Sequence, residues 1–254
     1  MFLINEVSKD DIKLNSFKQK SKLNDKIWDE NNTLLSKIRL RLLDICDDFI
    51  EELSIDVKPI DIVFCGSLAN YNWSSYSDID LHIVFDFKKV LKKDTELIED
   101  YFKAKRDIWK QTHSKLKIYG FPVEISIENT TDNIKSKGRY SLYKSKWLNE
   151  PVDLQDAKLN QDFIKTKSSK IVTEIDNLKK RLDKETDKHK IGLINKKAVK
   201  TFKMLKDLRK EGLNSKKGEM SSGNIIYKVI RRMKRITKLF DIINVSYDKS
   251  NSLD

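Results

Sequence analysis

Apolar residues gather in four short runs in the first half of the chain, and each run is bounded by turn-forming residues. Runs of this length, with apolar and polar positions alternating in part, predict β-strands rather than helices. The four predicted strands span residues 60–65, 79–87, 115–119 and 121–127. We therefore expect a small mixed β-sheet within residues 55–130.

Longer segments place apolar residues three and four positions apart, which predicts amphipathic helices. The predicted helices cover residues 26–54, 89–113, 156–184, 189–211 and 223–243. Residues 129–155 have a weaker pattern, and residues 211–218 form a clear break. The fold class expected is α+β: a small mixed β-sheet core flanked by helices, followed by an all-helical C-terminal domain.

We divide the chain into a polar N-terminal segment (1–25), a core (26–150) and a basic helical domain (151–254). Net charge supports the last boundary. The chain has 51 Lys and Arg against 39 Asp and Glu, a net charge of +12, and residues 151–254 hold 26 and 14 of these. The whole positive excess therefore lies in the helical domain. This excess of positive charge is typical of a polyanion-binding surface, but a lysine-rich surface that only contacts solvent would have the same charge.

The basic residues of the last predicted helix are the candidates for contact with nucleic acid. Apolar side chains fill one face of this helix, and the cations spread over the other. They are Lys228, Arg231, Arg232 and Arg235.

Two classes of protein are disfavoured by composition. No apolar run approaches the ~18 residues that a membrane span needs, so we expect no membrane partner. The two cysteines, Cys46 and Cys65, lack the spacing of metal or redox pairs. We expect both to be buried thiols in a reducing, cytoplasmic compartment.

Two aspartates occur one residue apart at the start of the second predicted strand. Asp78 and Asp80 then share one face of the strand, together with His82. Paired carboxylates repel unless a cation lies between them, and a hard divalent ion is the natural partner. Taken alone, the pair could equally be an exposed strand face.

The surrounding residues favour a metal-binding site over an exposed strand face. Gly66 and Ser67 end the first strand and open a predicted short helix over 68–72, where glycine lets the backbone approach a phosphate and serine adds a donor. A third carboxylate, Glu124, stands alone among apolar residues in the last strand. The order is that of a phosphate cradle followed by metal-binding acids.

These residues resemble the signature of the polymerase β-type nucleotidyltransferases. The match consists of Gly66-Ser67, ten intervening residues, and then Asp78-Ile79-Asp80-Leu81. The stretch GSLANYNWSSYSDIDLHIVFDF, with the later GRYSLYKSKWL, is also similar to small nucleotidyltransferase-like proteins encoded by large tailed phages. That likeness would make the compartment a bacterial host cytoplasm.

The resemblance implies transfer of NMP from an NTP to a hydroxyl, with release of pyrophosphate. It implies that Asp78, Asp80 and Glu124 hold two Mg²⁺ or Mn²⁺ ions, with Glu124 also serving as general base. Gly66 and Ser67 would hold the β- and γ-phosphates. Lys144 and Lys146 are additional candidates for the triphosphate.

The acceptor stays open. The basic helical domain tips the choice toward an RNA 3′ end, as in tRNA or tail addition. The alternatives are transfer to a small molecule or a protein, or synthesis of a nucleotide second messenger. A non-catalytic nucleic-acid-binding or antitoxin-like module, or a protein whose basic helices dock onto an acidic partner, would keep the fold without the reaction.

Overall fold

The chain forms two compact units in the computed structural model, which describes residues 7–90, 94–132, 134, 136–152 and 159–253. The sheet unit comprises residues 17–155, and the helical unit comprises residues 1–16 and 156–254. The segment 1–25 of the sequence analysis is thus divided at residue 16. The division at 155–156 lies near the predicted boundary at 150–151.

The sheet unit is built on a six-stranded mixed sheet with the strand order β3-β4-β2-β1-β5-β6. The strands are β1 (Asp61–Cys65), β2 (Ile79–Phe85), β3 (Lys117–Ile118), β4 (Phe121–Asn129), β5 (Arg139–Ser141) and β6 (Lys146–Asn149). Its helices are α1 (Ser36–Glu52), α2 (Phe87–Val90) and α3 (Thr95–Thr112). The predicted α+β class is confirmed.

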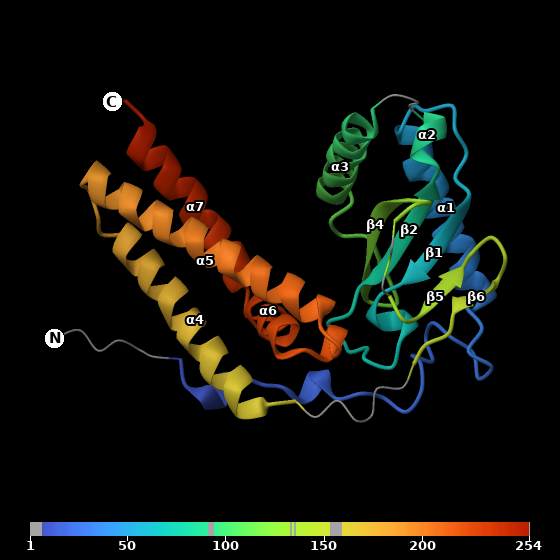
Figure 1. Ribbon diagram of the computed structural model, residues 1–254, viewed down its shortest axis with the longest axis horizontal. Helices are drawn as coiled ribbons and strands as arrows, with labels where there is room; N and C mark the ends of the chain where they lie inside the picture. The colour runs from blue at the N-terminus through green and yellow to red at the C-terminus, as the bar shows by residue number, and fades with distance from the viewer. Residues whose placement is uncertain (1–6, 91–93, 133, 135, 153–158, 254) are drawn as a thin grey trace. The chain divides into compact units, whose positions relative to one another are not determined.

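One parallel pairing sets the position of the candidate site. β2 and β4 run parallel, whereas every other pair of neighbouring strands is antiparallel. Parallel neighbours need a crossover connection, and the segment with α2 and α3 supplies it (Figure 1). The register places Asp80 opposite Glu124. Residues 44 positions apart therefore become neighbours on adjacent strands.

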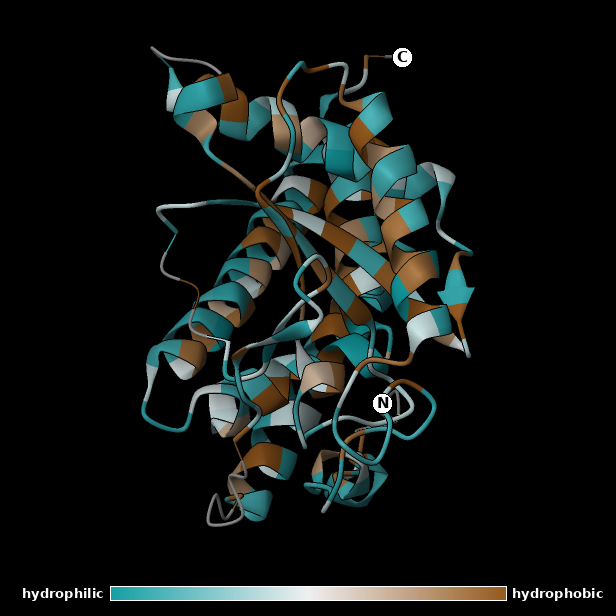
Figure 2. Ribbon diagram, turned by 90° about the vertical axis from the view of Figure 1, so that its right-hand side faces the viewer, coloured by the Kyte–Doolittle hydropathy of each residue, from teal (hydrophilic) through white to brown (hydrophobic). Residues whose placement is uncertain are grey.

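The two faces of this sheet differ in chemistry. Alternate residues of β1 and β2, such as Phe64 and Leu81, are fully buried in a core that also contains Phe49 of α1 and Phe102 of α3. The opposite face carries the polar side chains of β2 and β4. Colouring by hydropathy shows that individual helices also carry both hydrophobic and hydrophilic residues (Figure 2). The helices thus cover one face of the sheet, and the other face holds the candidate chemistry.

Two predictions for the sheet unit are corrected. The helix predicted over 26–54 begins only at Ser36, because Asp29 Oδ1 accepts hydrogen bonds from the backbone N–H groups of Asn31 and Thr33 and closes a turn. The weakly patterned segment 129–155 contains the β5–β6 hairpin, whose strands of three and four residues are too short to show a period. Residues 91–93, inside the helix predicted over 89–113, lie outside the described residues.

The helical unit contains four α-helices in its described part. They are α4 (Gln161–Leu182), α5 (Lys188–Asn214), α6 (Ser222–Arg232) and α7 (Arg235–Asn251). α5 packs against α6 and α7, and α4 packs against the same two helices. The predicted start of α4 at 156 lies outside the described residues.

The single helix predicted over 223–243 is two helices. Lys234 separates them in the left-handed conformation, with φ of 59°. Few residues other than glycine and asparagine adopt this conformation readily, so a lysine gives no sequence signal of a helix break. The spacing of apolar residues continues through residue 234 and does not reveal the break either. The unbroken apolar pattern reflects that α6 and α7 both bury residues in the same core.

The N-terminal segment belongs to the helical unit through specific contacts. The N–H of Val7 donates to Thr173 Oγ1 of α4, and Lys9 forms an ion pair with Asp162. Ser16 accepts a hydrogen bond from Arg232 of α6. Residues 7–16 are therefore tied to helices more than 150 positions away in sequence.

Among the described residues, no helix combines the length and the apolar character required to cross a bilayer.

Candidate active site

β1 ends in a glycine that touches one of the candidate carboxylates. Gly66 adopts φ of 77° and ψ of −164°, a conformation essentially confined to glycine. A Cβ atom at this position would lie 1.8 Å from Oδ2 of Asp80. Both the backbone conformation and the space therefore require glycine here, and the Asp80 carboxylate lies directly against its backbone.

The turn after Gly66 is shorter than the sequence indicated. The predicted helix over 68–72 is a single 3₁₀ turn, Ser67–Ala69. The predicted helix is therefore wrong, and one turn aligns few peptide dipoles. Phosphate binding by Gly66 and Ser67 stays a prediction. Ser67 Oγ lies 2.7 Å from Ser77 Oγ, which ties the turn to the residue preceding Asp78.

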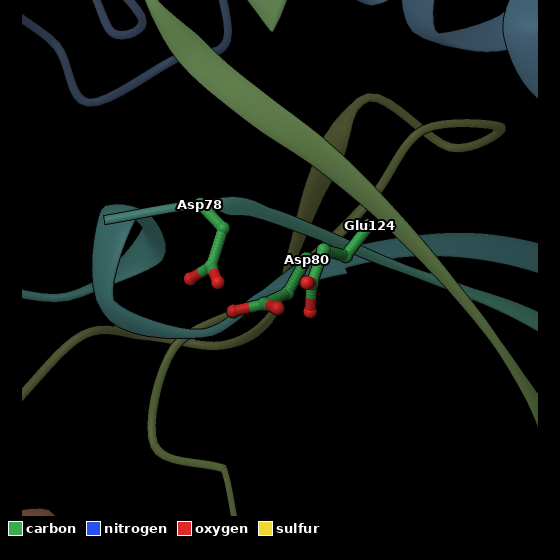
Figure 3. Close-up of side chains that lie close together, drawn as sticks. All are labelled: Asp78, Asp80 and Glu124. Carbon is green, nitrogen blue, oxygen red and sulfur yellow. The ribbon is translucent and has the colours of Figure 1, made fainter. Parts of the chain in front are cut away.

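Three carboxylates converge next to this turn. Asp78 immediately precedes β2, Asp80 lies in β2 and Glu124 lies in β4. One carboxylate oxygen from each residue lies within 4.8 Å of the others, and all three side chains are half-buried. They come from β2, the residue before it and β4, and they project to the same side (Figure 3). The sequence predicted these three residues, and the structure brings them together.

This donor set suits a hard divalent cation. Mg²⁺ and Mn²⁺ take carboxylate oxygens, and three mutually repelling acids are stabilised when a cation lies among them. Partial exposure leaves room for the water ligands that Mg²⁺ usually retains. The residues therefore fit the metal that the sequence analysis expects.

A lysine from the crossover helix contacts this cluster. Lys110 Nζ of α3 lies 2.7 Å from Glu124 Oε1. The lysine side chain is 66% exposed and the glutamate 38%, so solvent screens the pair and limits it to about 1 kcal/mol or less. Glu124 is held by a weak contact that a divalent cation can replace. No sequence pattern pointed to Lys110.

A buried polar cluster lies on the same face of the sheet. Glu128 Oε2 lies 2.9 Å from His82 Nδ1, and Glu128 Oε1 accepts a hydrogen bond of 2.7 Å from Arg139 Nη2. Burial opposes ionisation of Glu128, but the hydrogen bonds from His82 and Arg139 outweigh it and hold the carboxyl pKa below its usual value. Glu128 is therefore a carboxylate that anchors β4 to β2 and β5. Sequence reasoning missed both Glu128 and Arg139.

Asn70 braces the glycine turn. Its Nδ2 donates to the Gly66 carbonyl at 2.7 Å, and its Oδ1 accepts from the Gly138 N–H at 2.9 Å. A single side chain thus joins the end of β1 to the residue preceding β5. The sequence analysis did not identify this role of Asn70. The one feature that could have indicated it is the position of Asn70 between Gly66 and Asp80.

Both cysteines are free and buried, as predicted. Burial raises the pKa of the Cys65 thiol, and the negative charge of Asp80 raises it further. Burial likewise raises the pKa of Cys46, with a smaller contribution from Asp47. The two thiols stay protonated near neutral pH, so neither is a nucleophile for this site.

The predicted triphosphate lysines lie elsewhere in the sheet unit. Lys144 Nζ is 3.9 Å from Oδ2 of Asp61, the first residue of β1. Gly66 follows the other end of that strand, ~17 Å away at the usual rise per residue. Lys146 is exposed and lies on the edge strand β6, where it pairs with Ser141, which in turn pairs with Val63 in the middle of β1. The structure does not bring these lysines together with Gly66 and Ser67.

Two of the predicted nucleic-acid cations are neutralised within the helical unit. Lys228 forms an ion pair with Glu219, and its side chain is 18% exposed. Arg235 donates to Asp176 at 2.9 Å, and Lys238 occupies the other oxygen of this carboxylate. Arg235 thereby links α7 to α4, and Lys228 links α6 to the turn that precedes it.

The other two predicted cations differ from each other. Arg232 donates to Ser16 and is half-buried, whereas Arg231 is exposed. Sequence periodicity places all four cations away from the apolar stripe but does not reveal their partners. The structure does not bring the four together as one exposed surface.

Comparison with protein families gives one match. The model of a family described as "Nucleotidyltransferase domain" matches residues 46–154. Searches of curated proteins and of solved structures return no match. The matched segment contains β1 to β6, the Gly66 turn and all three clustered carboxylates. The sheet unit of this protein therefore carries a nucleotidyltransferase domain of the polymerase β-type superfamily.

Proposed function

We propose that the protein transfers a nucleoside monophosphate from an NTP to a hydroxyl acceptor, with divalent cations bound by its acidic cluster. The observation that carries this proposal is the convergence of Asp78, Asp80 and Glu124 beside Gly66, within a nucleotidyltransferase domain. The three carboxylates converge from β2, the residue before it and β4, and they supply the oxygen donors that the proposed reaction requires of its metal site.

Asp78, Asp80 and Glu124 are proposed to hold two Mg²⁺ or Mn²⁺ ions. When bound, the ions would offset the negative charge that develops around the α-phosphate and on the leaving pyrophosphate. Gly66 has no side chain, so a phosphate can approach its backbone closely, next to the Asp80 carboxylate. The Ser67 hydroxyl is proposed to donate to the β- or γ-phosphate.

The reaction balances with one proton transfer. The acceptor oxygen forms a bond to the α-phosphorus, and the bond from that phosphorus to the oxygen bridging the β-phosphate breaks. Pyrophosphate leaves with the electron pair. Glu124 takes the proton of the attacking hydroxyl and passes it to solvent, to which this half-buried side chain has access.

An RNA 3′ hydroxyl is the acceptor that we favour. The +12 net charge arises entirely in residues 151–254, so the helical unit attracts polyanions. A small-molecule or protein hydroxyl would need no such charge.

The test is an incorporation assay with each α-labelled NTP, Mg²⁺ or Mn²⁺, and an RNA pool. The variant Asp78→Asn/Asp80→Asn removes two carboxylates at nearly constant shape. Its matched control, Glu99→Gln/Asp100→Asn, removes the same charge from the exposed surface of α3.

We expect wild type and the control to label RNA and the Asp78/Asp80 variant to lose at least 10²-fold in rate. Label on protein or on a small product without RNA would keep the chemistry and change the acceptor. Equal incorporation by all three proteins, or none by wild type under any condition, would refute the catalytic assignment.

A further inference from the structure

The positive charge of the helical unit is concentrated on one helix that the sequence analysis did not single out. α5 holds nine Lys and Arg against two Asp and Glu, a balance of +7. α6, where the sequence analysis placed most of the nucleic-acid contacts, holds three cations and no acid, and α7 nearly balances. The electrostatic attraction of the unit therefore originates mainly on α5.

Four of the α5 lysines form a stripe along its exposed side. They are Lys196, Lys200, Lys203 and Lys210, and all four are exposed. At 100° per residue they fall within an arc of about 80°, and they extend over ~21 Å of helix. We refer to these four residues as the lysine stripe.

The lysine stripe is not neutralised by neighbours, in contrast to Lys228 and Arg235. Within the described part of the chain, none of its four ammonium groups forms an ion pair. One acid, Asp207, lies in the same arc. Four like charges on one face repel each other, and a ligand that carries a row of negative charges would offset this repulsion.

An open groove adjoins the lysine stripe on α5. It has a volume of about 520 Å³ and lies between α4 and α5, with Leu178 and Leu193 among its apolar lining. Lys170 and Arg181 also line it, and Lys197 lines it while paired with Glu174 at 3.0 Å. Leu193 is 49% exposed, so the apolar surface is accessible from solvent. A groove with apolar and cationic lining suits the flat face of an unpaired base.

We propose that α5 is a binding surface for single-stranded RNA, with phosphates on the lysine stripe and bases directed to the α4–α5 groove. The ~21 Å stripe is several times longer than the ~3.4 Å axial spacing of phosphates on one strand of a duplex, so its four lysines can each meet a different phosphate. This inference rests on the proposed function, since it supplies the acceptor of that reaction with a binding site.

The test measures RNA binding in the absence of NTP. The probe is a labelled single-stranded RNA of about 20 nucleotides, longer than the lysine stripe. The stripe variant changes Lys196, Lys200, Lys203 and Lys210 to Gln, which has a similar helix propensity. The matched control changes four other exposed lysines of the helical unit to Gln: Lys180, Lys216, Lys217 and Lys249.

We expect the stripe variant to bind at least tenfold more weakly at low salt than the control, although both carry the same net charge. The slope of log affinity against log salt should fall by about 3 in the stripe variant, since each single-strand phosphate contributes ~0.7. Single-stranded RNA should bind more tightly than a duplex of the same sequence. Circular dichroism establishes that both variants keep their helices.

Equal losses in the two variants would refute the stripe, because net charge alone would then explain binding. Tighter binding of the duplex, or binding of wild type to anionic vesicles but not to RNA, would also overturn the proposal. A DNA strand of equal length distinguishes a general phosphate surface from one that prefers RNA, and preference for DNA would overturn the RNA assignment. Since no NTP is present, these outcomes are independent of whether nucleotide transfer occurs.

Discussion

The substitution Gly66→Ala should displace the Asp80 carboxylate, an effect that can be measured separately from the loss of fold stability. The added Cβ would lie 1.8 Å from Asp80 Oδ2, where real contacts begin at about 3.0 Å. The carboxylate must therefore retreat by more than ~1 Å, and a misplacement of this size at a reacting centre can cost ~10²-fold in rate. The backbone conformation adds ~1–3 kcal/mol of strain to the folded state.

Gly120 provides the matched control. It also has a positive φ, of 88°, but a Cβ there would meet nothing within 4 Å. Gly120→Ala should therefore destabilise the protein by about 1–2 kcal/mol through backbone strain alone and leave the acidic cluster unchanged.

The assay compares Mn²⁺ affinity, measured by titration calorimetry well below the melting temperature, with the free energy of unfolding in urea. We expect both alanine variants to lose stability and only Gly66→Ala to lose metal affinity, by tenfold or more. If the two variants bind Mn²⁺ equally well, contact between Gly66 and Asp80 does not position the carboxylate, and the reasoning fails.

Three further perturbations test other contacts. Lys110→Met should raise Mn²⁺ affinity up to about fivefold in titration calorimetry, because the ammonium no longer competes for Glu124; weaker binding would contradict this. Glu128→Gln should destabilise the fold by about 3 kcal/mol at neutral pH, because Arg139 would keep a buried charge without its carboxylate. The lowered pKa of Glu128 means that its contribution is present above the unfolded-state pKa and is lost as pH falls through the folded-state value, so wild type should lose more stability than this variant below about pH 4.5 in urea titrations. Lys234→Gly should raise the melting temperature, since glycine relieves ~1 kcal/mol of left-handed strain between α6 and α7; a lower value would indicate that the lysine side chain contributes more than its backbone costs.

The strands that carry the site were predictable from sequence because one face of each is buried and the other carries polar side chains. Apolar and polar residues therefore alternate along the strand. Asp80 and Glu124 interrupt apolar runs, and Gly66 ends one. Those signals are local. Each depends on residues within a few positions of one another, which is the range over which periodicity carries information.

Contacts between distant segments were not predictable in the same way. Lys110 reaches Glu124 only because α3 and β4 pack together, and Arg139 reaches Glu128 from a strand of three residues. Lys228 and Arg235 were expected to face solvent, yet each meets an acid from another element. A helical wheel gives the direction of a side chain but not what the fold places opposite it.

The division of the chain between the two units has a consequence for the order of folding. Every strand of the sheet lies within 17–155, so the sheet unit can form from one continuous piece of chain. The helical unit cannot, because Val7, Lys9 and Ser16 find their partners in α4 and α6. During synthesis from the N-terminus, residues 7–16 emerge before α4 and α6 and must wait until these helices follow. This segment is therefore made long before its partners and reaches its native contacts only after the sheet unit can have formed.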